Sequence, residues 1–596
     1  MNKFAEYETI MNALCSYGHK TGGGPVVYQD ENNIWHPYTG EQHALYVAPT
    51  GKGKSQYGIF PLLKSLIENG ESVVLVDPKG ECTGYFQHLQ DQGLVSSDAN
   101  ITIIDMTNPE KSMGFNIFDY PFDLLKSNDS KDRQLGDSFV YDLVNATCIE
   151  SSNLNETSFW NNCSKSTLSG LTYLFSKMAG SNSYPTPSFF NTIMNQASSD
   201  IIENAKYLDK LCEVFDPEEG NATNNLGVYT NSQIKGTFVN TVIRDIRTTF
   251  LSDIRKWQGD SAIDTLMSHN DFSISNLDLD KQNIIIIIKP DNFEICDMIT
   301  GVFISQLSQY LIAKADNYYD DRRLPIRFNF ILEELGNIGK AIPTLPQLMT
   351  AARSRNVRLA LVLQDMQQLD FIYKENARTI LSNIGVTIAF GSEDPHTRQL
   401  LSARCGHYFS DYDPSRESLV LRPEDIGKMR VGQALIFLSG GVVFVSDLAQ
   451  IRDAAGYRLN RDAFLIHKSP SSDDAKERFQ VFFDNAILHK YKYLLDEECP
   501  SASANEIKAI TSGKIKPRQS TYSDEAFQWG ILALLYQKRF GIDANFHFND
   551  VFNKGIPFDI PHQANDQHYS WLVRAMNELD LKDYLLPIPK KRYTID

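Results

Sequence analysis

The stretch ALYVAPTGKGKS, residues 44–55, decides the fold. Its first four residues, Ala44–Val47, are apolar, as expected of a short buried strand. The next eight fit the phosphate-loop pattern G-x-x-x-x-G-K-[ST], except that Ala48 stands in place of the first glycine. A strand that leads directly into such a loop indicates a P-loop nucleotide-binding domain, and the alternative is a surface turn rich in glycine and lysine.

Each residue type in this loop has a chemical purpose. Gly51 and Gly53 let backbone N–H groups turn inward around a β-phosphate, and the N-terminus of the next helix adds the positive end of its dipole. Lys54 reaches the β- and γ-phosphates, and the Ser55 hydroxyl binds Mg²⁺. We therefore predict ATP and Mg²⁺ as ligands, with a nucleotide-binding set of Thr50, Gly51, Lys52, Gly53, Lys54, Ser55 and Gln56.

A second motif is an apolar run that ends in two carboxylates. The run FNFIL, Phe328–Leu332, is followed by Glu333 and Glu334. In a P-loop ATPase the first acid orients Mg²⁺ or its water, and the second polarises the attacking water. We predict Ser55 and Glu333 on the metal side and Glu334 as the catalytic carboxylate. Glu333 replaces the commoner Asp and is one methylene longer, which leaves its metal geometry open.

A third motif supplies further catalytic candidates. The run RLALVL ends at Gln364, where ring ATPases with a RecA-like core carry a polar residue that touches the γ-phosphate. An ordinary hydrogen-bonded glutamine is the alternative. Arg353 and Arg355 precede this run, and either is a candidate arginine finger for a neighbouring subunit, although a solvated arginine is the commoner fate.

Short apolar runs bounded by turn residues recur in two regions and read as buried parallel strands separated by helices. This pattern predicts an α/β fold, a RecA-like P-loop NTPase domain with a predominantly parallel sheet. The runs are Ala44–Val47, Val73–Val76, Ile101–Ile104, Ile284–Ile288, Phe328–Leu332, Leu359–Leu363, Val386–Phe390, Ala434–Leu438 and Val442–Val445.

The stretches without such runs predict the remaining organisation. We expect the nucleotide-binding domain to comprise residues 1–120 and 276–449. Residues 121–275 are polar with helical patterns, and we predict an inserted all-α domain. Residues 450–596 predict a C-terminal helical appendage for binding cargo or a partner, with a polar linker at Ser501–Ser520.

Composition restricts the class of protein. The formal net charge is −17, and residues 451–596 carry 20 basic and 20 acidic side chains, so the imbalance lies in residues 1–450. That charge repels nucleic acid at long range without excluding a basic channel lining. The eight cysteines show no C-x-x-C spacing, which argues against a zinc site. No signal peptide or uninterrupted run of about 18 apolar residues is present, and we expect a cytoplasmic protein.

Together these motifs resemble the type IV coupling proteins, the TraG-like ATPases of conjugation and type IV secretion. The resemblance begins with Ala48–Glu81, which includes Pro61-Leu62-Leu63 and a strand ending in Asp-Pro-Lys-Gly-Glu. It continues with Asn116 in the segment MGFNIFD, where Ile117 replaces the family's proline. The remaining matches are Glu333-Glu334-Leu-Gly-Asn337, the Arg-Ser-Arg region, Gln364, Gln368-Leu369, Asn383 and Arg422–Ile426.

The resemblance implies a homo-hexameric motor that receives a relaxase–DNA complex, with single- or double-stranded DNA, or a protein substrate. It passes this cargo to a type IV secretion channel. Most members carry an N-terminal transmembrane hairpin that this chain lacks, so the resemblance also implies a membrane adaptor protein that recruits the chain to the cytoplasmic face of the membrane, or a trimmed chain. Two alternatives stay open: an FtsK/HerA-like DNA translocase unconnected with secretion, and a non-hydrolysing, nucleotide-bound substrate receptor.

Overall fold

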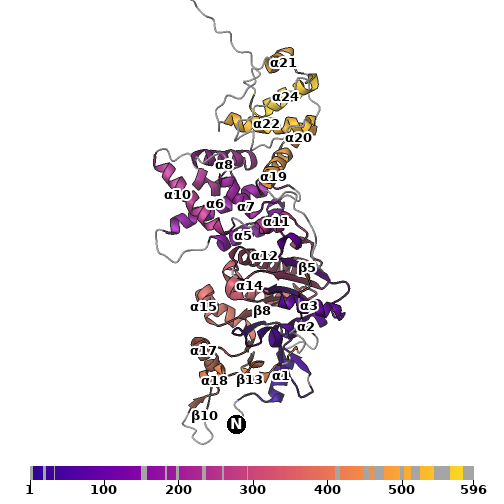
Figure 1. Cartoon of the computed structure of the whole chain (residues 1–596), viewed down its shortest axis with the longest axis vertical. Helices are drawn as coiled ribbons and strands as arrows, with labels where there is room; N and C mark the ends of the chain where they lie inside the picture. The colour runs from indigo at the N-terminus through magenta and orange to yellow at the C-terminus, as the bar shows by residue number, and fades with distance from the viewer. Residues whose placement is uncertain are drawn as a thin grey trace, which may run out of the picture. The chain divides into compact units, whose positions relative to one another are not determined.

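The computed structural model divides into two compact units (Figure 1). Unit 1 comprises Met1–Pro121, Asp137–Thr147 and Thr265–Ser469, and unit 2 comprises Phe122–Gly136, Cys148–Asp264 and Pro470–Asp596. The structure describes residues 4–17, 22–32, 34–148, 157–180, 184–195, 201–230, 237–257, 261–291, 293–409, 417–448, 450–451, 457, 459–461, 475–496, 502–511, 524–541 and 564–581.

A single large sheet organises unit 1. In the described part of the chain it has nine strands in the order β13-β12-β9-β3-β8-β7-β4-β6-β5. Each of the nine predicted apolar runs forms one of these strands, which confirms the predicted α/β fold. Their bounds are β3 (His43–Val47), β4 (Ser72–Asp77), β5 (Asn100–Asp105), β6 (Asn283–Ile288), β7 (Phe328–Leu332), β8 (Val357–Leu363), β9 (Ile384–Ala389), β12 (Gln433–Leu438) and β13 (Val442–Asp447).

The direction of the strands follows from their connections. The strands from β9 to β5 in this order pair in parallel, and their connections contain helices or helical segments, as parallel strands require. β12 pairs antiparallel with both β9 and β13, and the turn Ser439–Gly441 joins β12 directly to β13. The carboxyl ends of seven strands therefore meet along one edge of the sheet.

Helices cover both faces of the sheet, and alternate strand residues pack on each. The residues Tyr46, Leu75 and Val362 share one core cluster with helices α2 (Phe60–Glu68) and α3 (Glu81–Asp91). Helices α12 (Glu294–Tyr318) and α14 (Leu345–Ala352) contact β8. Because both faces are covered, the strands are buried throughout and read as continuous apolar runs.

Helix α12 is the one described helix long and apolar enough to cross a membrane by composition. In this structure 83% of the apolar 18-residue stretch of this helix is buried inside the protein. The helix has apolar residues on all sides, as in a core helix packed between other elements.

Smaller elements complete unit 1. They are α1 (Tyr7–Tyr17), the hairpin of β1 (Val26–Gln29) and β2 (Trp35–Pro37), α13 (Leu335–Ile338), α15 (Gln367–Tyr373), α16 (Ala377–Ser382), α17 (Pro395–Cys405), the pair β10 (His407–Phe409) and β11 (Glu417–Leu419), and α18 (Pro423–Gly427). Three further helices have residues in both units: α4 (Asp119–Lys126), α5 (Ser130–Thr147) and α11 (Ser261–Ser268).

In the described part of unit 2 the regular elements are helices, joined by loops. Its helix α19 packs among the helices of the predicted insert: the rings of Phe479 and Phe189 lie 5.3 Å apart, and Arg478 forms a buried ion pair of 3.3 Å with Asp264. The helices are α6 (Thr157–Met178), α7 (Pro187–Asn195), α8 (Ile201–Phe215), α9 (Asn221–Thr230), α10 (Thr237–Asp253), α19 (Ala475–Lys490), α20 (Lys492–Asp496), α21 (Ala504–Thr511), α22 (Asp524–Phe540) and α24 (Asp566–Glu578).

This packing groups the end of the chain with the helical insert, whereas the sequence treats residues 121–275 and 450–596 as separate domains. The difference arises because a local pattern does not show which distant segment covers an apolar face. The domain boundaries given above stay a prediction. Half of the linker predicted at Ser501–Ser520 lies outside the described residues, and the described half, residues 502–511, contains helix α21.

A buried ionic cluster fixes the amino ends of the central strands. Glu71 lies 3.2 Å from Arg358 and 3.5 Å from Arg327, and it accepts hydrogen bonds from Asn329 Nδ2 and the Gly23 backbone N–H. Burial lowers the pKa of Arg358 to about 10, and the charge of Glu71 opposes that shift. The cluster therefore links β4, β7 and β8 to the segment around Gly23. Each buried charge in it is stabilised by its partner of opposite sign.

We predict that Glu71→Ala destabilises unit 1 by about 3–5 kcal/mol, because it leaves a buried arginine without its partner. Hydrogen exchange of sheet amides in β4, β7 and β8 measures this loss. Asp447→Ala removes the exposed pair with Arg430, whose side chains are 74% and 71% exposed, and should change stability by about 0–1 kcal/mol. Equal effects of the two substitutions would contradict a stabilising role for the cluster.

Candidate active site

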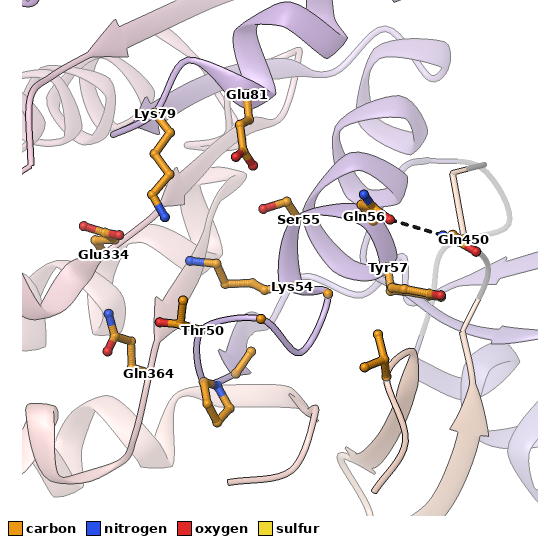
Figure 2. A pocket seen from close by; sticks show the side chains of 15 residues that line it. Thr50, Lys54, Ser55, Gln56, Tyr57, Lys79, Glu81, Glu334, Gln364 and Gln450 are labelled. Carbon is orange, nitrogen blue, oxygen red and sulfur yellow. Dashed lines mark hydrogen bonds between the residues drawn. The ribbon is translucent and has the colours of Figure 1, made fainter. Parts of the chain in front are cut away.

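The loop after β3 encloses a cavity of about 410 Å³ at the carboxyl edge of the sheet (Figure 2). Gly51 and Gly53 have φ angles of +81° and +84°, a region that residues with a Cβ rarely adopt. A Cβ at Gly53 would also lie 2.7 Å from the ring of Tyr57. After the loop, the chain makes a wide π-helical turn, Ser55–Ile59, that continues into α2. Both glycines are thus required by the shape of the loop.

Six of the seven residues predicted to bind nucleotide line this cavity: Thr50, Gly51, Gly53, Lys54, Ser55 and Gln56. The seventh, Lys52, does not. Its Nζ lies 3.8 Å from a carboxylate oxygen of Glu393 and 3.5 Å from the carbonyl oxygen of Met429. The side chain of Lys52 therefore holds the outside of the loop against neighbouring segments.

Glu334 lines the cavity opposite the loop (Figure 2). Its backbone has a φ of +55°, and its carboxylate accepts a hydrogen bond of 3.2 Å from Asn337 Nδ2. Burial and the negative charge of Asp291 raise the pKa of Glu334, while Lys54 and Lys79 oppose the rise. A carboxylate with a raised pKa next to a phosphate loop is suited to act on a proton of an attacking water.

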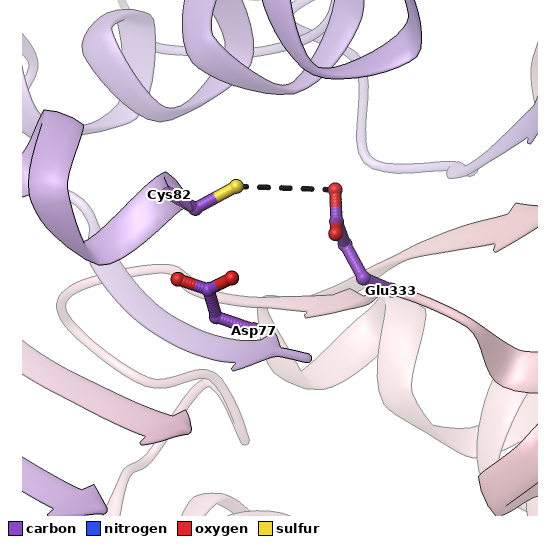
Figure 3. A group of neighbouring side chains, drawn as sticks. All are labelled: Asp77, Cys82 and Glu333. Atoms are coloured by element: carbon purple, nitrogen blue, oxygen red, sulfur yellow. Dashed lines mark hydrogen bonds between the residues drawn. The ribbon is translucent and has the colours of Figure 1, made fainter. Parts of the chain in front are cut away.

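Glu333 lies behind the cavity and does not line it. It is 6% exposed, and its Oε1 accepts a contact of 3.8 Å from the Cys82 thiol (Figure 3). Burial raises the pKa of Glu333 to about 7, and Lys54 opposes the shift. Asp77 completes a group of three whose possible metal-ligand atoms lie within 4.8 Å of one another.

Both carboxylate oxygens of Asp77 already accept hydrogen bonds. Oδ1 accepts from the backbone N–H groups of Lys79 and Gly80, and Oδ2 accepts from the backbone N–H and the hydroxyl of Thr83. These bonds hold the turn between β4 and α3. Asp77 thus holds the turn, and the contact of Cys82 with Glu333 links the turn to the end of β7.

The remaining predicted residues are divided between the two ends of β8. Gln364 follows the strand and lines the cavity, and its backbone N–H donates to Gln368 Oε1. Arg353 and Arg355 precede the strand and do not line the cavity. Arg355 donates from Nε and Nη2 to both carboxylate oxygens of Asp316, whereas Arg353 is exposed.

Five residues of the cavity wall were missed by motif reasoning: Tyr57, Lys79, Glu81, Val431 and Gln450. Lys79 and Glu81 had a signal, since they follow a predicted parallel strand at the same edge as the phosphate loop. Val431 and Gln450 had none, because they flank the two antiparallel strands far along the chain. Gln450 Nε2 donates to Gln56 Oε1 over 3.2 Å, the bond drawn in Figure 2.

One family profile, described as "Type IV secretory system Conjugative DNA transfer", matches residues 4–440. No curated protein sequence matches the chain. Similar solved structures include plasmid coupling protein TrwB with the non-hydrolysable ATP analogue ADPNP, at a TM-score of 0.51 and 15% identity over 78% of this chain and 96% of that one. TrwB with ADP and Mg²⁺ gives 0.49 and 16% over 76% and 95%. VirB4 of Thermoanaerobacter pseudethanolicus gives 0.39 and 13% over 73% and 98%.

At 15% identity, the similarity to the ADPNP-bound TrwB structure shows a shared fold. It agrees with the mostly parallel sheet and the helices on both of its faces. The chemistry of the cavity therefore has to be argued from the residues of this chain.

We predict that Gly53→Ala weakens phosphate binding more than Gly51→Ala. Both substitutions force a Cβ into a positive φ, but only the one at Gly53 also meets the ring of Tyr57. The double substitution Gly53→Ala/Tyr57→Ala removes that contact and should recover part of the loss. Nucleotide titration by fluorescence measures all three variants, and equal losses for the two single glycine variants would exclude the contact as a cause.

Proposed function

Since the chain belongs to the family of type IV secretory system proteins for conjugative DNA transfer, we propose that it hydrolyses ATP to couple a transferred substrate to the secretion channel. The observation that carries this proposal is the cavity of about 410 Å³ on which Lys54, Ser55, Glu334 and Gln364 converge. These residues come from three parallel strands and supply the parts that phosphoryl transfer needs: a cation, a hydroxyl, a carboxylate and an amide.

The residues present fit ATP with Mg²⁺. Backbone N–H groups of the loop and the Lys54 ammonium would hold the β- and γ-phosphates. The Ser55 hydroxyl is an oxygen ligand of the kind Mg²⁺ prefers, and the buried Glu333, which is 6% exposed, would be the carboxylate on the metal side. When bound, Mg²⁺ would neutralise charge on the phosphate oxygens.

Two residues would act at the γ-phosphate. Glu334 would orient the attacking water and accept its proton, and its pKa, raised by burial and by Asp291, makes its carboxylate a stronger base. Gln364 would contact the γ-phosphate and pass its loss to α15 through the bond from its backbone to Gln368. Hydrolysis would thus change the position of an element at the edge of the sheet.

The partners follow from the family. We propose that the cargo is a relaxase or relaxosome with DNA, single- or double-stranded, or a protein substrate, and that a membrane adaptor protein recruits the chain to the cytoplasmic face of the membrane beside the channel. Residues 450–596 would bind cargo or an accessory protein. The working form would be a homo-hexamer.

We predict that Lys54→Ala and Glu334→Gln separate nucleotide binding from chemistry. Lys54→Ala should abolish ATP binding and turnover, because it removes the cation that compensates the phosphates. Glu334→Gln should keep ATP bound while turnover falls by about 10²–10⁴, the usual loss of a general base. Phosphate release and ATP affinity measured on both variants test this. Parent-like turnover in either variant would overturn the assignment, and a parent that binds ATP without releasing phosphate would establish the non-hydrolysing receptor instead.

We also predict that Arg353→Ala lowers turnover only under conditions where subunits associate. Arg353 is exposed and precedes β8, whereas the cavity lies beyond the other end of that strand, so it can reach a phosphate only in a neighbouring subunit. Specific ATPase activity of the parent should rise from nanomolar to micromolar protein, and that of the variant should stay low. Arg422→Ala, at another exposed arginine, is the matched control. A flat concentration profile in the parent would contradict the ring.

A further inference from the structure

The turn between β4 and α3 brings a second carboxylate, Glu81, to the cavity (Figure 2). Hydrogen bonds hold this turn in place: Asp77 accepts from the backbone N–H groups of Gly80 and Thr83 over 2.9 and 2.7 Å. Gly80 has a φ of +73°, the conformation that ends the turn and starts the helix. Glu81 is therefore held at the first position of α3.

Sheet pairing places this turn next to the acidic motif. β4 pairs in parallel with β7, with Val76 opposite Leu332, so the residues after each strand emerge side by side. Figure 2 shows the carboxylate of Glu81 on the same side of the cavity as the Ser55 hydroxyl. Lys79, from the same turn, extends towards Glu334 and Lys54.

Glu81 and Glu333 differ in access. Among the described residues, the carboxylates that line the cavity are Glu81 and Glu334. Glu333 is 6% exposed and faces Cys82, while Glu81 is exposed. In the described part of the chain Glu81 forms no ion pair, so its charge remains directed at the cavity.

Mg²⁺ in nucleotide sites keeps several waters and takes one or two carboxylates besides the phosphates. Resting on the function proposed above, we propose that Glu81 is a metal-orienting residue that holds the hydration shell of nucleotide-bound Mg²⁺ on the Ser55 side of the cavity. Glu334 then acts at the γ-phosphate, and the two cavity-facing carboxylates have different tasks.

The test uses the full chain and a fluorescent ATP analogue, with its affinity measured in EDTA and at increasing Mg²⁺. Glu81→Gln should raise the Mg²⁺ concentration at half-maximal effect by about tenfold, the usual loss for a residue that orients a metal's ligands. Its affinity in EDTA should be no lower than that of the parent, because the substitution removes a negative charge from the cavity wall. Mn²⁺ titration followed by electron paramagnetic resonance gives the same comparison without turnover.

Asp91→Asn is the matched control, since Asp91 is an exposed carboxylate at the other end of α3. It should leave the Mg²⁺ midpoint unchanged, and Glu81→Asp, which keeps the charge, should recover part of the loss. A parent-like midpoint in Glu81→Gln, an equal loss of affinity in EDTA and in Mg²⁺, or a larger shift in Glu333→Gln would each overturn the proposal.

Failure of the proposed function is distinguishable from failure of this inference. A parent protein that does not bind the ATP analogue would refute the function itself. A parent that binds it in a Mg²⁺-dependent way, with a Glu81→Gln variant of the same midpoint, would refute the role of Glu81 alone.

Discussion

Parallel pairing of β3, β8, β7 and β4 is the constraint on which the rest of the site depends. Strands that run in one direction end at one edge, so each side chain that follows a strand lies within a few ångströms of the next turn along. The phosphate loop, Gln364, Glu334 and Glu81 follow these four strands. The backbone hydrogen bonds of the sheet set the distances between these residues. The site therefore does not depend on separate loops folding towards one another.

Within that edge, local backbone conformation decides which of two adjacent acids faces the cavity. Side chains alternate along a strand, and the positive φ of Glu334 turns the chain sharply at its end. Glu333 consequently points into the protein against Cys82, and Glu334 points outward into the cavity. Burial raises the pKa of both carboxyls, that of the enclosed Glu333 to about 7, and the charges of Lys54 and Lys79 both oppose the rise at Glu334.

The sequence predicts the sheet well because its strands are covered on both faces, so each reads as an apolar run such as Ile284–Ile288. It predicts the phosphate loop because the loop is one local segment. It does not reveal that Val431 and Gln450 line the cavity. These residues lie before β12 and after β13, and the antiparallel pairing of the two strands brings both to the same edge of the sheet. The short hairpin of β1 and β2 also escapes, since neither strand has a distinctive apolar pattern. Nor could a motif show that Lys52 turns away to Glu393.

The positive and negative charges around the cavity affect both the pKa of Glu333 and the binding of ATP. The carboxylates of Asp77, Glu81 and Glu334 all raise the pKa of Glu333, and Lys54 opposes them. The cavity wall itself presents two lysines, Lys54 and Lys79, and two carboxylates, Glu81 and Glu334. A nucleoside triphosphate would add several negative charges to a wall that is already balanced, and in a partly desolvated site such repulsion is screened poorly. We therefore expect tight binding of ATP by this arrangement to depend on a divalent cation that enters with the phosphates, and the proposed role of Glu81 places that cation beside the exposed carboxylate.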